Sequence, residues 1–447
     1  MTLQIQERKW NIAPYWLDGL VRELQPKSLT RNMSADVTVV GGGITALSIA
    51  WALSLAGMKV VVLEAGRIGE GSSGWPAGTI TANHTLDLKK VEENLGVEQL
   101  RHLVQSMEES LARLPKLFGA NDGFQSGSSL YLAGKKSHVN FLRSEHDIRL
   151  KYNLPTKFWE EKEVSSIYPG FSAAVECGGE YGVHPVRLLM ALAKTVVDKG
   201  GSLYEDSPVN PTGGWEQHGK NKFIVHCRAH KVESTHLVLC TGIKTSDFGD
   251  QDELSRLLVP VVNYVLVTQP CAQVKALCDR GIINGWDSQI IYHYWRNLSD
   301  GRLLVGGADN PGSTRASAVS ANEPEIRKLY SWAQNHHTFK LPPIQYAWRA
   351  GLVIPVDGLP LLKIEKRDNG GALVSAVTDG FAFALLLGNV VARAISSDQH
   401  DFDKMLSFRR HRVLEAKLLS WLPKTGLLRD MALKTGFAGF RLWDRWF

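Results

Sequence analysis

The chain has 447 residues, of which 44% are hydrophobic and 21% are charged. This is an ordinary globular composition, and a chain of this length can bury a large core and form two domains. The formal net charge of +6 is spread along the sequence rather than gathered into Lys/Arg runs with interleaved aromatic residues, which argues against a nucleic-acid-binding protein.

Cysteine usage and hydropathy restrict the class of protein further. The five cysteines form no CxxC pair and no Cys/His spacing suited to zinc or an iron–sulfur cluster, so we predict no metal site. The N-terminal segment MTLQIQERKW carries charge where a signal peptide needs an apolar core. The apolar stretches at residues 46–58 and 381–395 are cut short or interrupted by polar residues and glycine, so neither qualifies as a membrane span. We therefore expect a cytoplasmic protein, in keeping with an odd number of cysteines.

The first regular pattern lies between residues 35 and 63. An apolar run ending at Val40 precedes a glycine cluster, a stretch with helical spacing and a second apolar run at residues 60–63. Apolar runs on both sides of a helical stretch are typical of a βαβ unit with parallel strands.

Later segments alternate between helical and β-type patterns. Residues 86–118 have helical spacing, and short β-type runs return near residues 223–240. Between residues 259 and 307 the segments VPVVNYVLVTQ, QIIYHYW and GRLLVGG are typical of antiparallel strands, and a strand at 372–377 precedes a helix at 381–395. The predicted fold class is α/β with antiparallel β: a Rossmann-like dinucleotide-binding domain with an inserted antiparallel-sheet domain and a helical C-terminal tail.

The glycine cluster carries the clearest binding motif. Residues 41–46, GGGITA, fit the pattern G-x-G-x-x-G/A directly after a predicted strand and before a predicted helix. Gly41 permits the tight turn, Gly43 lets a pyrophosphate approach the backbone, and Ala46 keeps the helix close to the sheet. Glu64, which closes the second strand, would accept hydrogen bonds from ribose hydroxyls and repel a 2′-phosphate, which disfavours NADP. A simple glycine-rich turn is the alternative, but it does not account for the spacing of the strand, the helix and Glu64 along the chain.

The loop after the second strand favours FAD over NAD. Residues 64–74, EAGRIGEGSSG, are mostly small and can pass over a second phosphate or the edge of an isoalloxazine ring. An NAD enzyme usually returns to a helix sooner. The cofactor contacts predicted from this unit are Gly41, Gly43, Ile44, Thr45, Ala46, Glu64, Ala65, Arg67, Ser72, Ser73 and Gly74.

Segments spread over nearly the whole chain carry a family resemblance. ADVTVVGGGITALSIAWAL, VVVLEAGRIGEGSSG, GVHPVRLLMALAKTV, VLCTGIKTS and VPVVNYVLVTQP resemble the superfamily of D-amino-acid oxidase, glycine oxidase and sarcosine oxidase, and within it the gamma-glutamylputrescine oxidase branch. The resemblance implies a two-domain flavoprotein in which hydride leaves a C–H next to nitrogen for the flavin, and water hydrolyses the resulting imine. It also implies cofactor contacts at Val209, Thr241, Gly242, Gly351, Asp379, Gly380 and Phe381.

The same resemblance suggests how the chain divides. We predict a discontinuous FAD-binding domain from residues 34–100, 175–250 and 347–398, and a substrate domain from residues 101–174 and 251–346. Residues 399–447 form the predicted helical tail. Its mixture of aromatic and basic residues is compatible with an interfacial helix, so membrane contact is the alternative. We expect the tail to pack on the flavin domain instead, because it resembles the closing segment of a soluble branch.

Departures from the family pattern leave the substrate open. Trp-Pro at residues 75–76 replaces an Arg-Asn pair, and Thr-Asp-Gly at 378–380 replaces a Gly-His-Gly. Val353 and Ala382 stand where relatives place the arginine or lysine that holds an α-carboxylate. Ala350 stands where monomeric sarcosine oxidase has the cysteine for covalent flavin. The resemblance therefore implies non-covalent FAD and makes simple α-amino acids less favoured substrates.

The predicted catalytic residues are Tyr292, Tyr294 and Asp379. Alternate residues of the expected strand at 292–295 should point into a substrate pocket. A carboxylate at Asp379 would either attract a protonated amine or oppose negative charge on the reduced flavin. The alternative is that Asp379 only caps the helix that follows.

Three other polar residues carry weaker interpretations. Arg296 and Arg349 could each hold a substrate carboxylate, but we expect both to be solvated or at a sheet edge. His184 precedes a proline and is expected at the start of a helix rather than as a catalytic base.

The function predicted from the sequence is FAD-dependent oxidation of the C–N bond of a small amine or amino-acid derivative, with oxygen or another electron acceptor. One alternative is a flavin dehydrogenase docked on a membrane or a partner. Another is a flavin-binding subunit or maturation factor without amine oxidase activity. No Ser/His/Asp order, H-E-x-x-H helix or Walker lysine supports a hydrolase or an NTPase.

Overall fold

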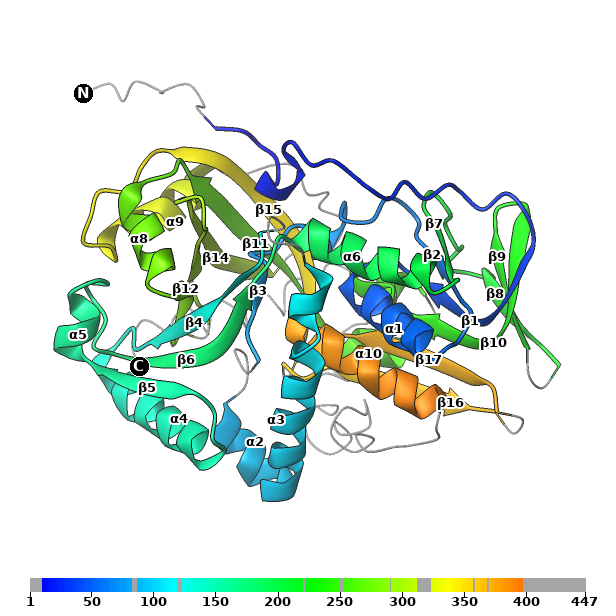
Figure 1. The fold of residues 1–447 in the computed structure, drawn as a ribbon, viewed down its shortest axis with the longest axis horizontal. Helices are drawn as coiled ribbons and strands as arrows, with labels where there is room; N and C mark the ends of the chain where they lie inside the picture. Colours follow the sequence, from blue (N-terminus) through cyan, green and yellow to red (C-terminus); the bar gives the residue numbers. More distant parts are fainter. Residues whose placement is uncertain are drawn as a thin grey trace.

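Two β-sheets and the helices around them make up the part of the protein that the structure describes (Figure 1). The computed structural model describes residues 10–82, 87–118, 123–219, 222–248, 252–289, 291–311, 323–356, 358–367 and 370–396. The predicted tail at residues 399–447 lies outside these residues, so its helical character and its packing stay predictions.

The first sheet is mostly parallel and contains the predicted βαβ unit. Its strand order is β16-β17-β10-β1-β2-β7, and a β8–β9 hairpin joins at β10. The bounds are β1 Met33–Val40, β2 Val60–Leu63, β7 Ser202–Tyr204, β8 Trp215–His218, β9 Lys222–Cys227, β10 His230–Leu239, β16 Leu361–Lys366 and β17 Ala372–Val377. Strand β1 pairs in parallel with β2 on one side and with β10 on the other. Helix α1 (Ile44–Leu55) connects β1 to β2, which confirms the predicted strand–helix–strand unit.

Helices α1, α6 (Pro185–Asp198) and α10 (Phe381–Ser396) cover one face of this sheet (Figure 1). Alternate residues of β1 face opposite sides, because side chains in a strand have a period of two. Val39 therefore belongs to the core under the helices, whereas Val40 belongs to a smaller core with the β9 side chains.

The second sheet has the order β15-β11-β14-β13-β12-β4-β6-β3, with β5 paired to β6. Its bounds are β3 Thr79–Ile80, β4 Gln125–Leu132, β5 Thr156–Glu160, β6 Ala173–Gly182, β11 Leu258–Thr268, β12 Ile282–Asp287, β13 Tyr294–Asn297, β14 Leu303–Pro311 and β15 Ile344–Pro355. Neighbouring strands are antiparallel except β12 and β4, which are parallel. The remaining helices are α2 Leu88–Leu95, α3 Val97–Leu111, α4 Val139–Lys151, α5 Glu161–Ser165, α7 Asp252–Arg256, α8 Ala272–Asp279 and α9 Glu323–Asn335. The two sheets together confirm the predicted fold class.

Some boundaries differ from the sequence pattern. The expected strand through QIIYHYW is shorter, since β13 begins only at Tyr294, and β12 was not predicted although all its residues are buried. Strands β3 and β6 pair within the second sheet, and α3 packs against α10 of the first. These contacts link segments on both sides of the predicted divisions, and the domain boundaries stay predictions.

Arg296 occupies a position that the sequence interpretation missed. Its side chain is only 1% exposed, which contradicts the expectation of a solvated or sheet-edge arginine. The guanidinium donates to Gln125 Oε1 at 2.6 Å and to the backbone carbonyls of Ala77, Gly78 and Val183 at 2.5–3.1 Å. It therefore joins β13 to β4 and to the segments that flank β3 and β6.

Two glycines make room for this buried group. A Cβ at Gly78 would lie 2.6 Å from Arg296 Nη1, and a Cβ at Gly182 would lie 2.7 Å from Nη2. Burial lowers the pKa of Arg296 to about 9, so the side chain stays charged at neutral pH. Neutral carbonyl and amide oxygens, arranged around the planar fork, compensate for its desolvation.

The substitution Arg296→Lys tests this arrangement. We expect it to lower the free energy of unfolding by about 2–4 kcal/mol, because one ammonium cannot replace the fork and buried carbonyls lose their donors. Chemical or thermal unfolding of both proteins measures the difference. The control is Arg302→Lys, whose guanidinium bonds Asp300 near the surface, and which should change stability by no more than about 1 kcal/mol. Equal losses in the two variants would contradict the special role of Arg296.

Candidate functional site

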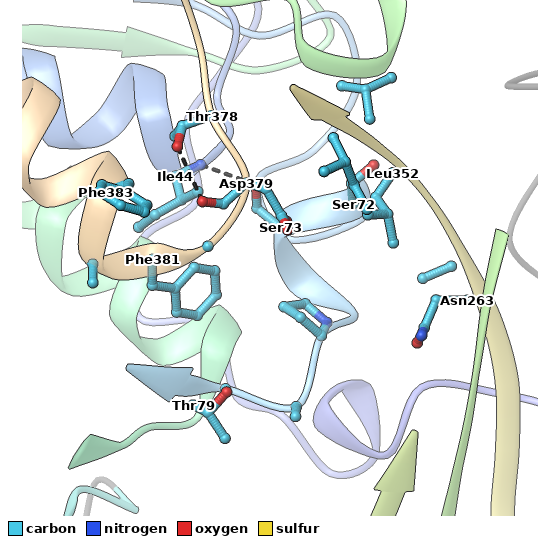
Figure 2. A pocket seen from close by; sticks show the side chains of 18 of the residues that line it. Ile44, Ser72, Ser73, Thr79, Asn263, Leu352, Thr378, Asp379, Phe381 and Phe383 are labelled. Carbon is cyan, nitrogen blue, oxygen red and sulfur yellow. Dashed lines mark hydrogen bonds between the residues drawn. The ribbon is translucent and has the colours of Figure 1, made fainter. Parts of the chain in front are cut away.

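A large cavity lies where the carboxyl ends of the parallel strands meet the second sheet (Figure 2). Its walls include Gly43 after β1, Cys240 after β10 and Val377 at the end of β17, together with side chains from β11, β13, β14 and β15. It encloses about 1560 Å³ including its open mouth. The edge formed by strand carboxyl ends is also where open α/β sheets bind their ligands.

Helix α1 begins at one end of this cavity. Gly41 has a φ of 113°, and a Cβ there would lie 2.4 Å from the Cys240 carbonyl oxygen, so only glycine fits. Gly43 is the N-cap and lines the cavity, and Ile44 N–H donates to Ser73 Oγ at 3.0 Å. A helix N-terminus whose N-cap is glycine lets a ligand come close to the backbone. Such a site is suited to phosphate, because its N–H groups and dipole favour negative charge. The geometry therefore fits the predicted pyrophosphate position.

Glu64 holds the two loops of the βαβ unit together. Its carboxylate accepts from Gly42 N–H at 2.6 Å and from Gly66 N–H at 2.8 Å. Burial raises the pKa of Glu64, and these backbone donors lower it in part. Both oxygens thus have a backbone partner, while the predicted contact with ribose hydroxyls stays a prediction.

The structure gathers some of the predicted cofactor residues in the cavity wall. Those that line it are Gly43, Ile44, Thr45, Ser72, Ser73, Gly242, Asp379, Gly380 and Phe381. Those that do not are Gly41, Ala46, Glu64, Ala65, Arg67, Gly74, Val209, Thr241 and Gly351. Two residues of the second group lie next to lining residues. The Gly351 carbonyl accepts a hydrogen bond from Ser72 Oγ at 2.6 Å. Gly74 follows Ser73, and a Cβ at Gly74 would lie 1.8 Å from the Gly69 carbonyl oxygen.

Two of the predicted catalytic residues lie side by side. Tyr292 and Tyr294 both line the cavity, with ring centroids 6.0 Å apart, whereas His293 between them is hydrogen-bonded through Nδ1 to Asp287 Oδ2 at 3.1 Å. This matches the expected alternation, although Tyr292 precedes β13. Burial, followed by the nearby carboxylates, raises the pKa of both phenols, so each stays protonated at neutral pH.

Asp379 lines the cavity just before α10, on the side away from Asn263 (Figure 2). Its side chain is half-buried in the wall, where burial raises its pKa to about 6 and the backbone N–H of Gly380 lowers it in part. The carboxyl is therefore mostly ionised at neutral pH. Its charge reaches the two tyrosines, since it contributes to the raised pKa of each.

Residues at the departures from the family pattern also line the cavity. Ala350, Val353 and Ala382 are all in its wall, where none offers a charge or a nucleophile. The Trp-Pro pair at residues 75–76 is held by indoles: Trp348 Nε1 donates to Trp75 O at 2.9 Å, and Trp16 Nε1 donates to the next carbonyl at 2.8 Å. This turn carries no charge, and its backbone is held in place by the two indoles, where the family pattern has the cation and the amide of an Arg-Asn pair.

Sequence reasoning missed several polar residues of this wall. Asn263 and Asp309 line the cavity from β11 and β14. Asn263 is a lone amide in the apolar run VPVVNYVLV, and that interruption is a signal that could have identified it. His184 lies where we expected: it is the N-cap of α6, and its Nδ1 accepts from Arg187 N–H at 3.3 Å. Arg349 is half-buried in β15 and does not line the cavity.

Comparison with known proteins decides the family. The family model described as FAD dependent oxidoreductase, DAO, matches residues 36–394. The chain belongs to this family. FAD is therefore its cofactor and the protein is an oxidoreductase, as the sequence predicted.

Individual members of the DAO family agree with this assignment. The chain is 24% identical to gamma-glutamylputrescine oxidoreductase of Escherichia coli, over 84% of this chain and 87% of that protein. It is 23% identical to the probable oxidoreductase OrdL of Haemophilus influenzae, over 98% of each protein. The solved glycine oxidase of Geobacillus kaustophilus is 20% identical, covers 81% of this chain and 95% of its own, and has a TM-score of 0.66. These likenesses confirm the predicted superfamily and its fold.

Two other kinds of site are absent from the described residues. Among them no group of three or more His, Cys, Asp or Glu side chains could hold a metal ion. In the same part of the chain, no helix is both long and apolar enough to cross a membrane.

The substitution Gly43→Val tests the cofactor position. We expect a purified protein that has lost most of its flavin absorbance, because a branched side chain beside Ser73 Oγ would fill the space at the start of α1. The control is Gly71→Val in the neighbouring loop, where a Cβ meets nothing within 4 Å. A yellow Gly43→Val protein with unchanged flavin content would contradict the assignment.

Acid precipitation of the wild-type protein tests the mode of attachment. We expect free FAD in the supernatant, since Ala350 offers no sulfur for a covalent bond. Flavin that remains with the precipitated polypeptide would show that another residue forms a covalent link.

Proposed function

We propose that the protein oxidises the carbon–nitrogen bond of a small amine that carries a positive charge. Bound FAD supplies the hydride acceptor for such a reaction. The observation that carries the proposal is the charge of the cavity wall. Asp309 and Asp379 line the cavity, and among the described lining residues none is Lys, Arg or His.

This charge distribution favours an ammonium group over a carboxylate. A cation that enters a partly desolvated cavity with two carboxylates is attracted by both. A carboxylate substrate would meet no cation among the described lining residues, and Val353 and Ala382 are apolar where relatives would place the clamp. The name of the relative gamma-glutamylputrescine oxidoreductase gives that protein an amine derivative as its substrate, which supports the same class here.

The position of Asp379 supports a role in orienting the amine. Its carboxyl is next to α10, whose N-terminus helps to keep it ionised. Its charge contributes to the raised pKa of Tyr292 and Tyr294, which line the same cavity. We infer that Asp379 attracts the protonated amine and that the two phenols form the opposite side of the substrate site. The bound amine would lose one proton, to solvent or to a carboxylate of the wall, before hydride leaves its α-carbon for the cofactor, and water would then hydrolyse the imine product.

Anaerobic mixing with a panel of compounds tests the reaction. We expect polyamines or N-methyl amines to bleach the flavin, and α-amino acids to do so poorly. Bleaching by α-amino acids alone would contradict the substrate class. If no amine bleaches the flavin while a protein partner co-purifies, the alternative of a flavin-binding subunit is correct instead.

The electron acceptor needs a separate measurement. Turnover in air that yields one hydrogen peroxide per substrate identifies an oxidase. Turnover that requires an artificial acceptor identifies a dehydrogenase, which is the alternative that docks on a membrane or a partner.

The substitution Asp379→Asn tests the role of the charge while keeping a side chain that can cap a helix. We expect amine affinity to fall about tenfold to a hundredfold, the loss expected when a charged hydrogen bond is removed. In the wild type, amine affinity should also weaken as the pH falls through about 6, because Asp379 then becomes protonated; the variant should lack this inflection. The control Asp300→Asn changes a surface carboxylate that bonds Arg302. If Asp379→Asn leaves both the affinity and the pH profile unchanged, the residue acts only as a cap.

A further inference from the structure

Three polar side chains on neighbouring strands form a connected group at the cavity wall. They are Tyr294 on β13, Asn263 on β11 and Asp309 on β14, and all three line the cavity. In the sheet β14 lies between β13 and β11. We call this group the Asp309–Asn263–Tyr294 relay. Figure 2 shows Asn263 on the side of the cavity opposite Asp379.

The backbone is shaped to bring these groups together. Tyr294 is paired with Gly306 of β14, and a Cβ at Gly306 would lie 2.0 Å from Tyr294 Cζ and 2.2 Å from its hydroxyl oxygen. The ring therefore crosses over β14 at a position where its cross-strand neighbour has no side chain. The pairing of β11 with β14 shifts register between Val262 and Tyr264, so Asn263 stands at the irregularity. A bulge of this kind re-aims a side chain.

The hydrogen bonds of the relay run in one direction. An ionised Asp309 carboxylate only accepts, so it fixes the Asn263 amide with Nδ2 toward it, and Nδ2 donates to Asp309 Oδ1 at 2.5 Å. The Asn263 carbonyl oxygen then faces the other way and can only accept. Tyr294 OH donates to this oxygen at 2.8 Å. The hydrogen of the Tyr294 hydroxyl is thus committed to the relay.

We propose that Asp309, acting through Asn263, makes the Tyr294 hydroxyl a hydrogen-bond acceptor for substrate, so that this site takes an ammonium N–H and rejects a carboxylate. The inference rests on the proposed oxidation of a cationic amine and names a specificity device for it. A phenol whose hydrogen is used elsewhere can offer only its lone pairs to a ligand. A substrate carboxylate, which has only lone pairs, would leave two acceptors facing each other in a partly desolvated site.

The protonation state of the phenol agrees with this role. Burial first, and then the charges of Asp309 and Asp379, raise the pKa of Tyr294. The phenol therefore stays neutral at working pH and does not become a phenolate that could itself pair with a cation. Asp309 and Asn263 are positioning residues here, and Tyr294 is the group that touches the ligand.

Ligand binding to the FAD-loaded protein tests the proposal without turnover. The probes are butyrate and butylammonium, which match in chain length and differ in the charge of the polar end. The readout is the change that each ligand causes in the flavin absorbance spectrum during anaerobic titration. In the wild type we expect butylammonium to bind more tightly than butyrate.

The substitution Asn263→Leu removes the acceptor of the Tyr294 hydroxyl and so breaks the relay. The hydroxyl can then donate its hydrogen to a ligand. We expect butyrate affinity to rise by about tenfold, the value of one hydrogen bond to a charged group. The matched control is the double variant Asn263→Leu/Tyr294→Phe, in which the gain should disappear because the hydroxyl is gone. A role confined to stabilising the sheet would change the melting temperature but give no gain that depends on Tyr294.

A second variant covers the case in which Asn263→Leu does not fold. Asp309→Asn lets the Asn263 amide turn either way and should also raise butyrate affinity. If that gain persists after Tyr294→Phe is added, the lost charge alone explains it and the relay is wrong. An unchanged butyrate affinity in folded Asn263→Leu also overturns the proposal.

These outcomes are separate from those of the proposed function. A butyrate gain that depends on Tyr294, in a protein whose flavin no amine bleaches, would support the relay and reject the amine oxidation. Amine bleaching together with a butyrate affinity that none of the variants changes would support the oxidation and reject the relay.

Discussion

The close approach of helix α1 to its neighbours is the constraint on which the rest of this structure depends. At its start, Gly41 lies so near β10 that a Cβ would be 2.4 Å from the Cys240 carbonyl oxygen. Along its side, Gly388 of α10 lies so near that a Cβ would be 2.5 Å from the Ser48 carbonyl oxygen. These contacts fix α1 against both the sheet and α10. As a result the N-termini of both helices open on the same cavity, at Ile44 and Phe381.

The cavity consequently has two kinds of wall. One is made of helix starts and glycine turns, whose N–H groups and dipoles favour anionic groups such as phosphates. The other is the face of the second sheet, where Asp309 stands among phenols and an amide. Asp379 belongs to the first wall, since it precedes α10, but its charge also contributes to the raised pKa of both tyrosines of the second. A dinucleotide and a cationic amine could therefore each find a complementary surface in one continuous space.

The parts predicted from sequence were those that depend on local pattern. Strand–helix–strand periodicity and the glycine spacing defined the βαβ unit around Gly41, because both are written in consecutive residues. The burial of Arg296 could not be read in this way, since it depends on Gly78 and Gly182, which lie far from it in the chain. Nor could the link between Tyr294 and Asn263, which requires Gly306 to face Tyr294 in the sheet. Cross-strand register decides such contacts, and one sequence alone does not specify it.

The pairing of β10 also bears on how the protein reaches its folded state. This strand, His230–Leu239, has β1 (Met33–Val40) as one parallel neighbour and β17 (Ala372–Val377) as another. Contacts between residues so far apart in sequence are slow to form, because a long loop must close before they contribute. During synthesis, β1 leaves the ribosome long before either of those partners exists. The exposed edge of the β1–β2 pair is then a site for mispairing and aggregation. We therefore expect low temperature or chaperones to assist the step in which β10 and β17 join the nascent sheet.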